Sequence, residues 1–410
     1  MTWPVVPLND LQADQPRAIT DGPFGSNLAS RHYTDHGPRV VRLQNIGDGS
    51  FVDEKAHISQ EHFESLRAHE VLAGDLLVAS LGEVLPRACL APPALGAAIV
   101  KADCIRVRLH PDVEPRWVMY AMQRPEIRRW ADSHRHGVGR PRLGLKVIRQ
   151  IPVPVPPLDE QRRIVALLED HLSRLDAADA YVRSATQRLA SAGRSALDRF
   201  FGGRDVPLAD LVDNISAGKS YGAANAPAAD NEWGIIKVSA MTWGKFDPTE
   251  NKAVPSNRAD PRFEIREGDL LVSRANTDEY VGASVLVGSV RAKLLLSDKS
   301  LRVSPADGVR PDWLWRALQA PSARRQISAL ATGTKDSMRN ISQASLMRVR
   351  VPRATRQEQA AAVSAYAEIA PAVDRLRTEL DSAHRRSAGL RRSLLAAAFS
   401  GQLTAEMATA

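Results

Sequence analysis

Three residue patterns in this chain suggest catalysis, and each falls short of what its chemistry requires. An adenine methyltransferase needs an Asp/Asn-Pro-Pro-Tyr-type motif for the flipped base, but Pro92-Pro93 and Pro156-Pro157 lack the residues that should flank the prolines. A phosphate-binding loop needs a glycine five residues before Gly-Lys-Ser/Thr, and Gly218-Lys219-Ser220 has Asp213 there. Asp53-Glu54-Lys55 matches only half of a nuclease-type carboxylate–lysine pattern. We therefore predict no catalytic constellation in the chain.

Basic side chains are concentrated in two glycine-containing segments, which we predict to be loops. His134 to Lys146 holds three glycines and a proline, and its counterpart, Thr332 to Asn340, is rich in glycine and threonine. Arginine can pair bidentately with guanine or with phosphate. Because both segments precede a Val-Pro-containing stretch at matching offsets, we favour DNA contact over ordinary solvated loops. The candidate DNA contacts are Arg135, Arg140, Arg142, Lys146, Lys335, Arg339 and Asn340.

Further polar residues are weaker candidates for the same role. Ser26, Asn27, Gln44 and Asn45 either read bases or phosphates or cap turns, and the sequence leaves both readings open. Comparable places in the second half hold Lys219, Tyr221, Lys237, Arg274 and Asn276. Aromatic residues make up only 5% of the chain, too few for a single-strand stacking platform, so duplex DNA is the favoured ligand.

Composition is that of an ordinary globular protein with a basic excess. The chain has 410 residues, of which 44% are hydrophobic, and its 55 Lys and Arg against 47 Asp and Glu give a net charge of +8. That excess suits a polyanionic partner, and the length suggests two or three domains. The start lacks a signal-peptide pattern, and no apolar run approaches the roughly 20 residues that span a bilayer. We expect a cytoplasmic chain with no membrane partner, and Cys89 and Cys104 as buried thiols.

The sequence is an internal duplication. Gly74-Asp75-Leu76-Leu77-Val78 returns as Gly268-Asp269-Leu270-Leu271-Val272, and Glu160-Gln161 returns as Glu358-Gln359. Other landmarks repeat in the same order, with offsets between 194 and 200. The first part of each copy has short apolar runs bounded by Gly, Asp and Pro, typical of strands, and short helical patterns near Trp117 and Trp313. We predict a small mixed α/β domain in each, at 1–157 and 204–355.

The second part of each copy, 158–203 and 356–402, carries apolar residues at heptad spacing. We predict two long helices with a helix–helix seam, followed by a tail at 403–410. The first seam comprises Ile164, Leu168, Leu175, Ala178, Val182, Ala185, Leu189, Ala192 and Ala196, and the second Tyr366, Ile369, Val373, Leu376, Leu380, Ala383, Leu390, Leu394 and Ala397. Pro371 either kinks the second helix or begins a helix that restarts after Ala370.

Several motifs, in order along nearly the whole chain, resemble the specificity subunit of type I restriction-modification systems. The most specific are the Pro-Leu-x-Glu-Gln-Arg-Arg-Ile entry into the first helix and the closing Ala-Phe-Ser-Gly-Gln-Leu. The motifs lie at Asp21 to Leu28, Val41 to Gly49, Gly74 to Val78, Ile151 to Val165 and Leu390 to Leu403. The second copy departs from the pattern: Val351 to Gln359 keeps only Pro and Glu-Gln, and Ile215 to Ala224 lacks Gly-Pro-Phe-Gly-Ser-Asn. Transfer of residue roles to that copy is therefore less safe.

The resemblance implies an α+β protein with two α/β target-recognition domains in pseudo-twofold tandem repeat, separated by two long antiparallel coiled-coil helices. It implies a non-catalytic subunit that binds a bipartite duplex-DNA target and recruits two adenine methyltransferase subunits, together with restriction/translocase subunits in a full complex. S-adenosylmethionine, ATP and Mg²⁺ are then expected on the partners, and no cofactor or metal in this chain. Two alternatives stay open: a stand-alone DNA-binding regulator or adaptor with the same architecture, and a self-contained nuclease or methyltransferase with unusual motifs.

Overall fold

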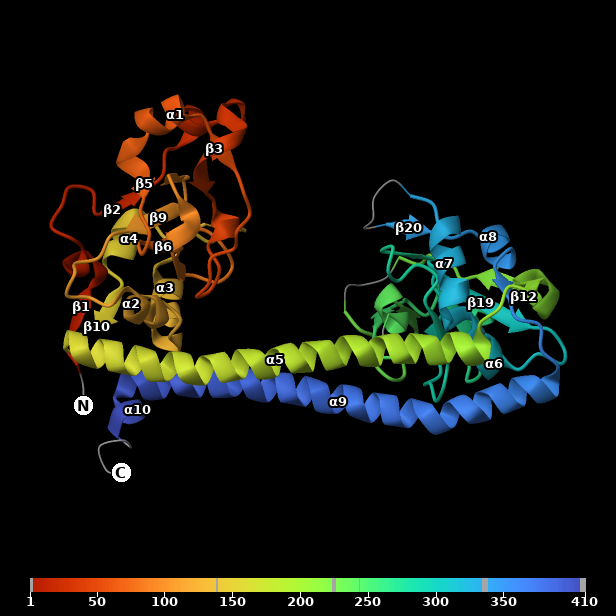
Figure 1. Cartoon of the computed structure of the whole chain (residues 1–410). Coiled ribbons are helices and arrows are strands. Elements are labelled where there is room, and N and C mark those ends of the chain that lie inside the picture. The colour runs from red at the N-terminus through yellow and green to blue at the C-terminus, as the bar shows by residue number, and fades with distance from the viewer. Residues whose placement is uncertain (1–2, 138, 223–225, 243, 334–337, 406–410) are drawn as a thin grey trace. The chain divides into compact units, whose positions relative to one another are not determined.

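The chain divides into two compact units, of which one combines two segments far apart in the sequence and the other is a single continuous stretch. The computed structural model describes residues 3–137, 139–222, 226–242, 244–333 and 338–405. Unit 1 combines Met1–Tyr181 with Ala383–Ala410, and unit 2 is Val182–Ser382. Each unit therefore contains one α/β domain and one part of each of two long helices, α5 and α9 (Figure 1). The predicted fold class is confirmed, whereas the compact units divide the chain differently from the domain boundaries that we predicted.

Unit 1 is built on two four-stranded sheets. The first has the antiparallel order β2-β9-β6-β7, and the second has the order β4-β3-β8-β5 with β3 and β8 parallel. All four residues of β6 are buried, as expected for a continuous apolar run in a central strand. The strands are β2 (Ile19–Asp21), β3 (Tyr33–Val41), β4 (His57–Ile58), β5 (Glu70–Val71), β6 (Leu76–Ala79), β7 (Arg87–Leu90), β8 (Ala98–Val100) and β9 (Cys104–Val107).

Short helices cover both sheets of unit 1 and complete its core. Trp117 of α2 is fully buried in the same cluster as Leu76 and Val78 of β6. A two-stranded pairing of β1 with β10 joins the start of the domain to the segment just before α5. These elements are β1 (Val5–Pro7), β10 (Pro152–Pro154), α1 (Gln60–Ser65), α2 (Pro115–Met122), α3 (Pro125–His134) and α4 (Leu145–Arg149).

Unit 2 repeats this topology. Its four-stranded sheet has the order β12-β19-β15-β17, a three-stranded sheet has the order β14-β13-β18, and β11 pairs with β21 as β1 does with β10. Trp313 of α6 is buried against β15, in the place that Trp117 has in unit 1. The elements are β11 (Val206–Pro207), β12 (Val212–Ala217), β13 (Gly234–Ile236), β14 (Asn251–Ala253), β15 (Leu270–Ser273), β16 (Ala275–Asn276), β17 (Ser284–Leu286), β18 (Leu294–Leu295), β19 (Ser300–Pro305), β20 (Arg339–Asn340), β21 (Arg350–Val351), α6 (Pro311–Gln319), α7 (Pro321–Leu330) and α8 (Gln343–Met347).

The two long helices, α5 (Leu158–Phe201) and α9 (Arg356–Ser400), pair in opposite directions within each unit. In unit 1 the beginning of α5 packs against the end of α9, where Leu168 and Leu395 share one core cluster. In unit 2 the end of α5 meets the beginning of α9, and the rings of Phe201 and Tyr366 lie 5.4 Å apart. A short helix, α10 (Gln402–Ala405), follows α9.

Part of the predicted seam is wrong. Ala178 and Ala192 of α5 are exposed, as are Ile369, Leu376 and Leu390 of α9. A two-helix pair buries only a narrow stripe, so heptad spacing overestimates the buried set where no domain covers the outer faces.

Pro371 is exposed and lies inside the continuous helix α9, so the helix does not restart after Ala370. Figure 1 shows α9 bending in its N-terminal part.

Among the described residues, no helix is long and apolar enough to cross a membrane.

A buried glutamine at the start of each long helix holds that helix to its domain. The Gln161 side chain accepts a hydrogen bond from the Glu114 amide at 3.0 Å and donates one to the Pro156 carbonyl at 2.8 Å. Gln359 repeats both contacts, with the Arg310 amide at 2.8 Å and the Ala354 carbonyl at 2.9 Å. The glutamine of the repeated Glu-Gln motif therefore anchors each long helix to its domain. The sequence showed that this residue is repeated but did not show its role.

Candidate nucleic-acid interface

In unit 1 the basic loop is held against the core by backbone pairing around Arg142. The backbone of Arg142 pairs with that of His136, and the Leu143 amide donates to the Ser80 carbonyl at 2.8 Å. The Arg142 guanidinium lies 2.6 Å from the Asp103 carboxylate and 5.5 Å from the centre of the Phe24 ring. Arg142 is exposed, and 45% of Phe24 is exposed as well. An oriented arginine with solvent-facing donors is therefore presented at this surface.

Phe24 brings a second predicted segment to the same place. Ser26 and Asn27 follow it in a short 3-10 helix, Gly25–Leu28, and both side chains are exposed. The Asn27 carbonyl accepts a hydrogen bond from His62 at 2.9 Å, which ties this loop to α1. The structure thus joins Arg142 to the Gly-Pro-Phe-Gly-Ser-Asn loop, which the sequence separates by more than a hundred positions.

The other predicted cations of this loop differ in their surroundings. Arg140 is exposed and has no ion-pair partner in the described part of the chain. Arg135 lies 3.2 Å from Asp132, one turn earlier, so its charge is partly compensated. Lys146 is exposed on α4.

Unit 2 places three predicted residues in one groove of about 390 Å³. Arg274, Asn276 and Asn340 line it, because β16 and β20 pair in antiparallel register with Asn276 opposite Arg339 and Ala275 opposite Asn340. Lys299 lines the same groove and was missed by the sequence reasoning. The remaining lining residues are Val238, Ala275, Asp298 and Met338.

The groove of unit 2 has the same backbone frame as the Arg142 surface of unit 1. The Arg274 amide donates to the Lys299 carbonyl, as the Ser80 amide does to that of Asp103. The Ile341 amide donates to the Arg274 carbonyl, as Leu143 does to Ser80. Arg274 therefore stands at the position of Ser80, Lys299 at that of Asp103, and Asn340 at that of Arg142. Extending the duplication offset of 196 to Asp103 would have pointed to Lys299.

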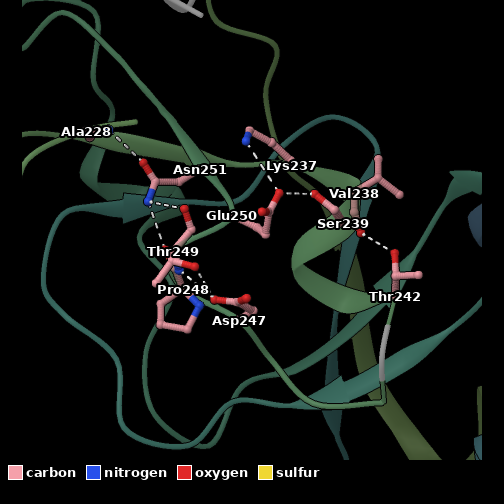
Figure 2. Close-up of polar contacts among 10 residues, drawn as sticks. All are labelled: Ala228, Lys237, Val238, Ser239, Thr242, Asp247, Pro248, Thr249, Glu250 and Asn251. Carbon is pink, nitrogen blue, oxygen red and sulfur yellow. Dashed lines mark hydrogen bonds and ion pairs between the residues drawn. The ribbon is translucent and has the colours of Figure 1, made fainter. Parts of the chain in front are cut away.

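Each unit gathers a cation and a polar side chain around one glutamate. In unit 2 the Glu250 carboxylate accepts from Ser239 at 2.5 Å and from Lys237 at 3.4 Å (Figure 2). These contacts, that of Ser239 first, hold the pKa of Glu250 below its usual value. In unit 1 Gln44 donates to Glu54 at 2.7 Å. Gln44 and Lys237 are thus held beside a carboxylate, which reduces the positive potential that Lys237 can offer a phosphate.

Asn45 takes the turn-capping alternative that the sequence left open. Its side chain is fully buried, accepts from the Arg42 amide at 2.8 Å, and donates to the carbonyls of Val52 at 2.7 Å and Glu54 at 2.8 Å. Both N–H groups of its amide and one acceptor position of its oxygen are engaged in the loop, so the structure favours the capping role for Asn45.

The Arg339 side chain also makes contacts within its own unit. It is half-buried, donates to the carbonyls of Ser328 at 3.2 Å and Ala331 at 2.8 Å, and lies 3.5 Å from Asp278. Its guanidinium therefore bonds carbonyls at the end of α7, and its role as a DNA contact stays a prediction. Lys335 lies outside the described residues.

Lys219 and Tyr221 form a further cation–aromatic pair, in a segment whose backbone pairs with Ser297. The Lys219 ammonium lies 5.7 Å from the centre of the Tyr221 ring, and Lys219 is exposed. Burial, followed by the charge of Asp260, raises the pKa of Tyr221, so its phenol stays protonated at neutral pH.

Within the described ranges, no group of three or more His, Cys, Asp or Glu could hold a metal ion.

The chain is similar to known type I restriction-modification proteins. Residues 98–178 match the family model of the type I restriction modification DNA specificity domain. The chain is 28% identical over 195 residues to the type I restriction enzyme EcoEI specificity subunit of Escherichia coli, covering 47% of this chain and 33% of that protein. It is 24% identical over 279 residues to the EcoKI specificity subunit of Escherichia coli strain K12, covering 62% of this chain and 58% of that protein. The aligned regions thus span about one third and somewhat over half of these relatives.

The fold is shared more widely than the sequence. A chain from a structure on complex assembly and conformational transition of the type I restriction-modification system superposes with a TM-score of 0.70 at 19% identity, over 98% of both chains. The matched domain, the relatives and this fold agree with the motifs at both ends of the long helices. Residues 98–178 thus match a type I DNA specificity domain, and the chain is similar in sequence to two type I specificity subunits.

Proposed function

We propose that this chain is the non-catalytic DNA-recognition subunit of a type I restriction-modification complex and reads a bipartite duplex target, one half-site per unit. The observation that carries this proposal is the shared backbone frame that presents different side chains in the two units. Unit 1 presents Arg142 beside Asp103, and unit 2 presents Asn340 beside Lys299. A repeated frame with exchanged side chains is what two half-sites of different sequence require.

The chemistry of these side chains suits base and phosphate contacts. Arginine pairs bidentately with the O6 and N7 of guanine, and asparagine with the N6 and N7 of adenine. Asp103 and Phe24 restrict the orientation of Arg142, which reduces the entropy lost when it binds. Arg274 and Lys299 add positive charge to the groove of unit 2, where phosphate contacts supply affinity without sequence choice.

Selectivity in this scheme is the sum of two modest terms. A mismatched base pair costs roughly 1–3 kcal/mol, and the costs of well-separated positions add approximately. Neither half-site alone then needs to distinguish its target from the whole genome. The long helices α5 and α9, each continuous from one unit into the other, would set the unread gap between the half-sites.

The proposed partners are two adenine methyltransferase subunits, joined by restriction/translocase subunits in a full complex. In this scheme S-adenosylmethionine, ATP and Mg²⁺ bind to the partners. The exposed apolar side chains Tyr181, Leu376 and Leu390 on the long helices offer surface for such subunits.

A methylation map of the source genome, with and without this gene, tests the proposal. We expect loss of N6-methyladenine at one split motif with a fixed gap, and recovery when the gene is restored. Restoring the gene as Arg142→Ala should relax one half of that motif and leave the other unchanged. An unchanged map, with the partner methyltransferase expressed, would instead support the regulator or adaptor alternative, which predicts tight DNA binding by the chain alone.

A further inference from the structure

Unit 2 contains a cationic cavity of about 380 Å³ that the proposed DNA-reading role does not use. It is enclosed by α5, α6, α9 and the loop that holds Gly244 and Lys245. Four cationic side chains line it, and Asp374 is the one carboxylate among its lining residues. The cations are Arg194, Lys245, Arg316 and Arg377. The size lies within the range of small-molecule sites in proteins.

Most of this positive charge is uncompensated. Arg377 lies 3.2 Å from Asp374, which neutralises one of the four cations. Arg194 and Lys245 are exposed and form no ion pair with any residue that the structure describes. Four cations and one carboxylate leave a net charge of +3 (4 − 1) around the cavity, which favours a multiply charged anion over a single carboxylate group.

Arg316 is the most constrained of the four. Its guanidinium lies 3.8 Å from the centre of the Trp315 ring and 5.1 Å from that of Tyr366, and it donates to Gln319 at 3.0 Å. No carboxylate of the described chain pairs with it, although it is half-buried. Because Arg316 occupies the aromatic faces, a planar base has little ring surface to stack on, whereas an oxyanion can use the remaining guanidinium donors.

The same place in unit 1 shows that the fold does not require these charges. Tyr120 follows Trp117 by three residues, as Arg316 follows Trp313, and Tyr120 is buried. Leu168 and Leu172, both buried, stand at the positions of Tyr366 and Ala370 counted from the anchoring glutamines. The duplication thus places the buried side chains of Tyr120, Leu168 and Leu172 at these positions in unit 1, whereas cations line the cavity in unit 2.

The remaining cation positions give the same contrast with one exception. Ser50 stands where Lys245 is, and Asp179 stands where Arg377 is, when counted from Arg42 and from Gln161. The position of Arg194 stays basic in unit 1 as Arg392. Three of the four cations occur in this copy only, around a cavity, which indicates a ligand of that copy.

We propose that the cavity lined by Arg194, Lys245, Arg316 and Arg377 binds a phosphate-class oxyanion. The phosphate is carried either by a small phosphorylated molecule or by the DNA backbone. Paired arginines recognise phosphate oxygens through several parallel hydrogen bonds, and Lys245 adds a mobile point charge from the loop.

Calorimetric titration of the full chain with inorganic phosphate, pyrophosphate and ATP tests this site. We expect binding that strengthens from phosphate to pyrophosphate and weakens at least tenfold in the double variant Arg194→Ala/Lys245→Ala, whose exposed side chains are dispensable for folding. Arg316→Gln should weaken it as well. Arg188→Ala, which removes an exposed charge from α5 outside the cavity, is the matched control and should bind like the unaltered chain.

Duplex DNA distinguishes the two sources of the phosphate. If the DNA backbone occupies the cavity, pyrophosphate competes with duplex, and the double variant lowers the slope of log affinity against log salt by about 1 per lost contact. If a small molecule occupies it, DNA affinity is the same in the double variant. The proposal is overturned if none of the three probes binds at millimolar concentration and DNA binding is also unchanged, or if Arg188→Ala weakens the probes as much as the double variant. The methylation map, which tests the DNA-recognition role, is independent of this result.

Discussion

Replacing Gln161 by leucine should loosen unit 1 without touching unit 2. The substitution keeps a buried side chain of similar volume but removes the acceptor for the Glu114 amide and the donor for the Pro156 carbonyl. A buried polar group left without a partner costs about 1–3 kcal/mol. The Pro156 carbonyl is buried and the Glu114 amide only partly so, which places the total loss at about 2–4 kcal/mol. Gln359→Leu should cost unit 2 less, because both of its bonds are only partly buried.

Hydrogen exchange resolved by peptide is the appropriate assay, because one unfolding midpoint is poorly defined for a chain of two compact units. A loss of about 2 kcal/mol raises the exchange rate of amides that open with the whole unit roughly 25-fold or more, since about 1.4 kcal/mol corresponds to a factor of ten. In Gln161→Leu we expect this increase in α2, residues Pro115–Met122, while α6, residues Pro311–Gln319, stays as it was.

Gln357→Leu provides the matched control, because this glutamine is exposed on the first turn of α9. It should leave exchange in both units unchanged. The reasoning is refuted if Gln161→Leu changes exchange in α2 by less than about threefold, or if Gln357→Leu has an equal effect. In either case the glutamine of the Glu-Gln motif would be serving some purpose other than anchoring the helix.

Three further predictions concern recognition, spacing and chemical reactivity. Asn340→Ala should weaken discrimination at one base position of the unit 2 half-site by about 1–3 kcal/mol. Binding to duplexes that vary at each position measures this loss. Equal weakening of binding to every sequence would instead assign Asn340 to phosphate contact. Inserting four residues, about one helical turn, within 165–195 should change the gap or abolish binding while each half-site keeps its identity, and methylation mapping that shows the original gap would rule out the spacer role. Burial raises the pKa of the Cys89 thiol to about 12, so the native protein should react with thiol reagents at pH 8 only after denaturation. Because the folded form keeps this proton while an exposed thiol loses it, the contribution of Cys89 to stability is complete below about pH 8.5 and is lost as pH rises toward 12; unfolding measured by urea titration at pH 8 and pH 10 checks this sign.

Sequence alone determined the features that depend on local pattern. The duplication, the apolar strand Leu76–Ala79 and the helical segments near Trp117 and Trp313 follow from residue order and periodicity, and the structure contains each of them. Strong heptad patterns over about forty residues likewise predicted α5 and α9, because helical spacing is a property of neighbouring residues along the chain. The family motifs belong to the same class of signal.

Tertiary structure decided what depends on neighbours distant in the chain. Asn45 and Gln44 are adjacent in sequence, yet one is fully buried in a turn and the other is exposed beside Glu54. Leu376 and Leu390 fit the heptad but face solvent, because no domain covers that side of the helix. Lys299 joins Arg274 and Asn340 only through the pairing of strands and loops. Burial and charge pairing are set by which surfaces meet after folding, and spacing along the chain carries no direct record of that.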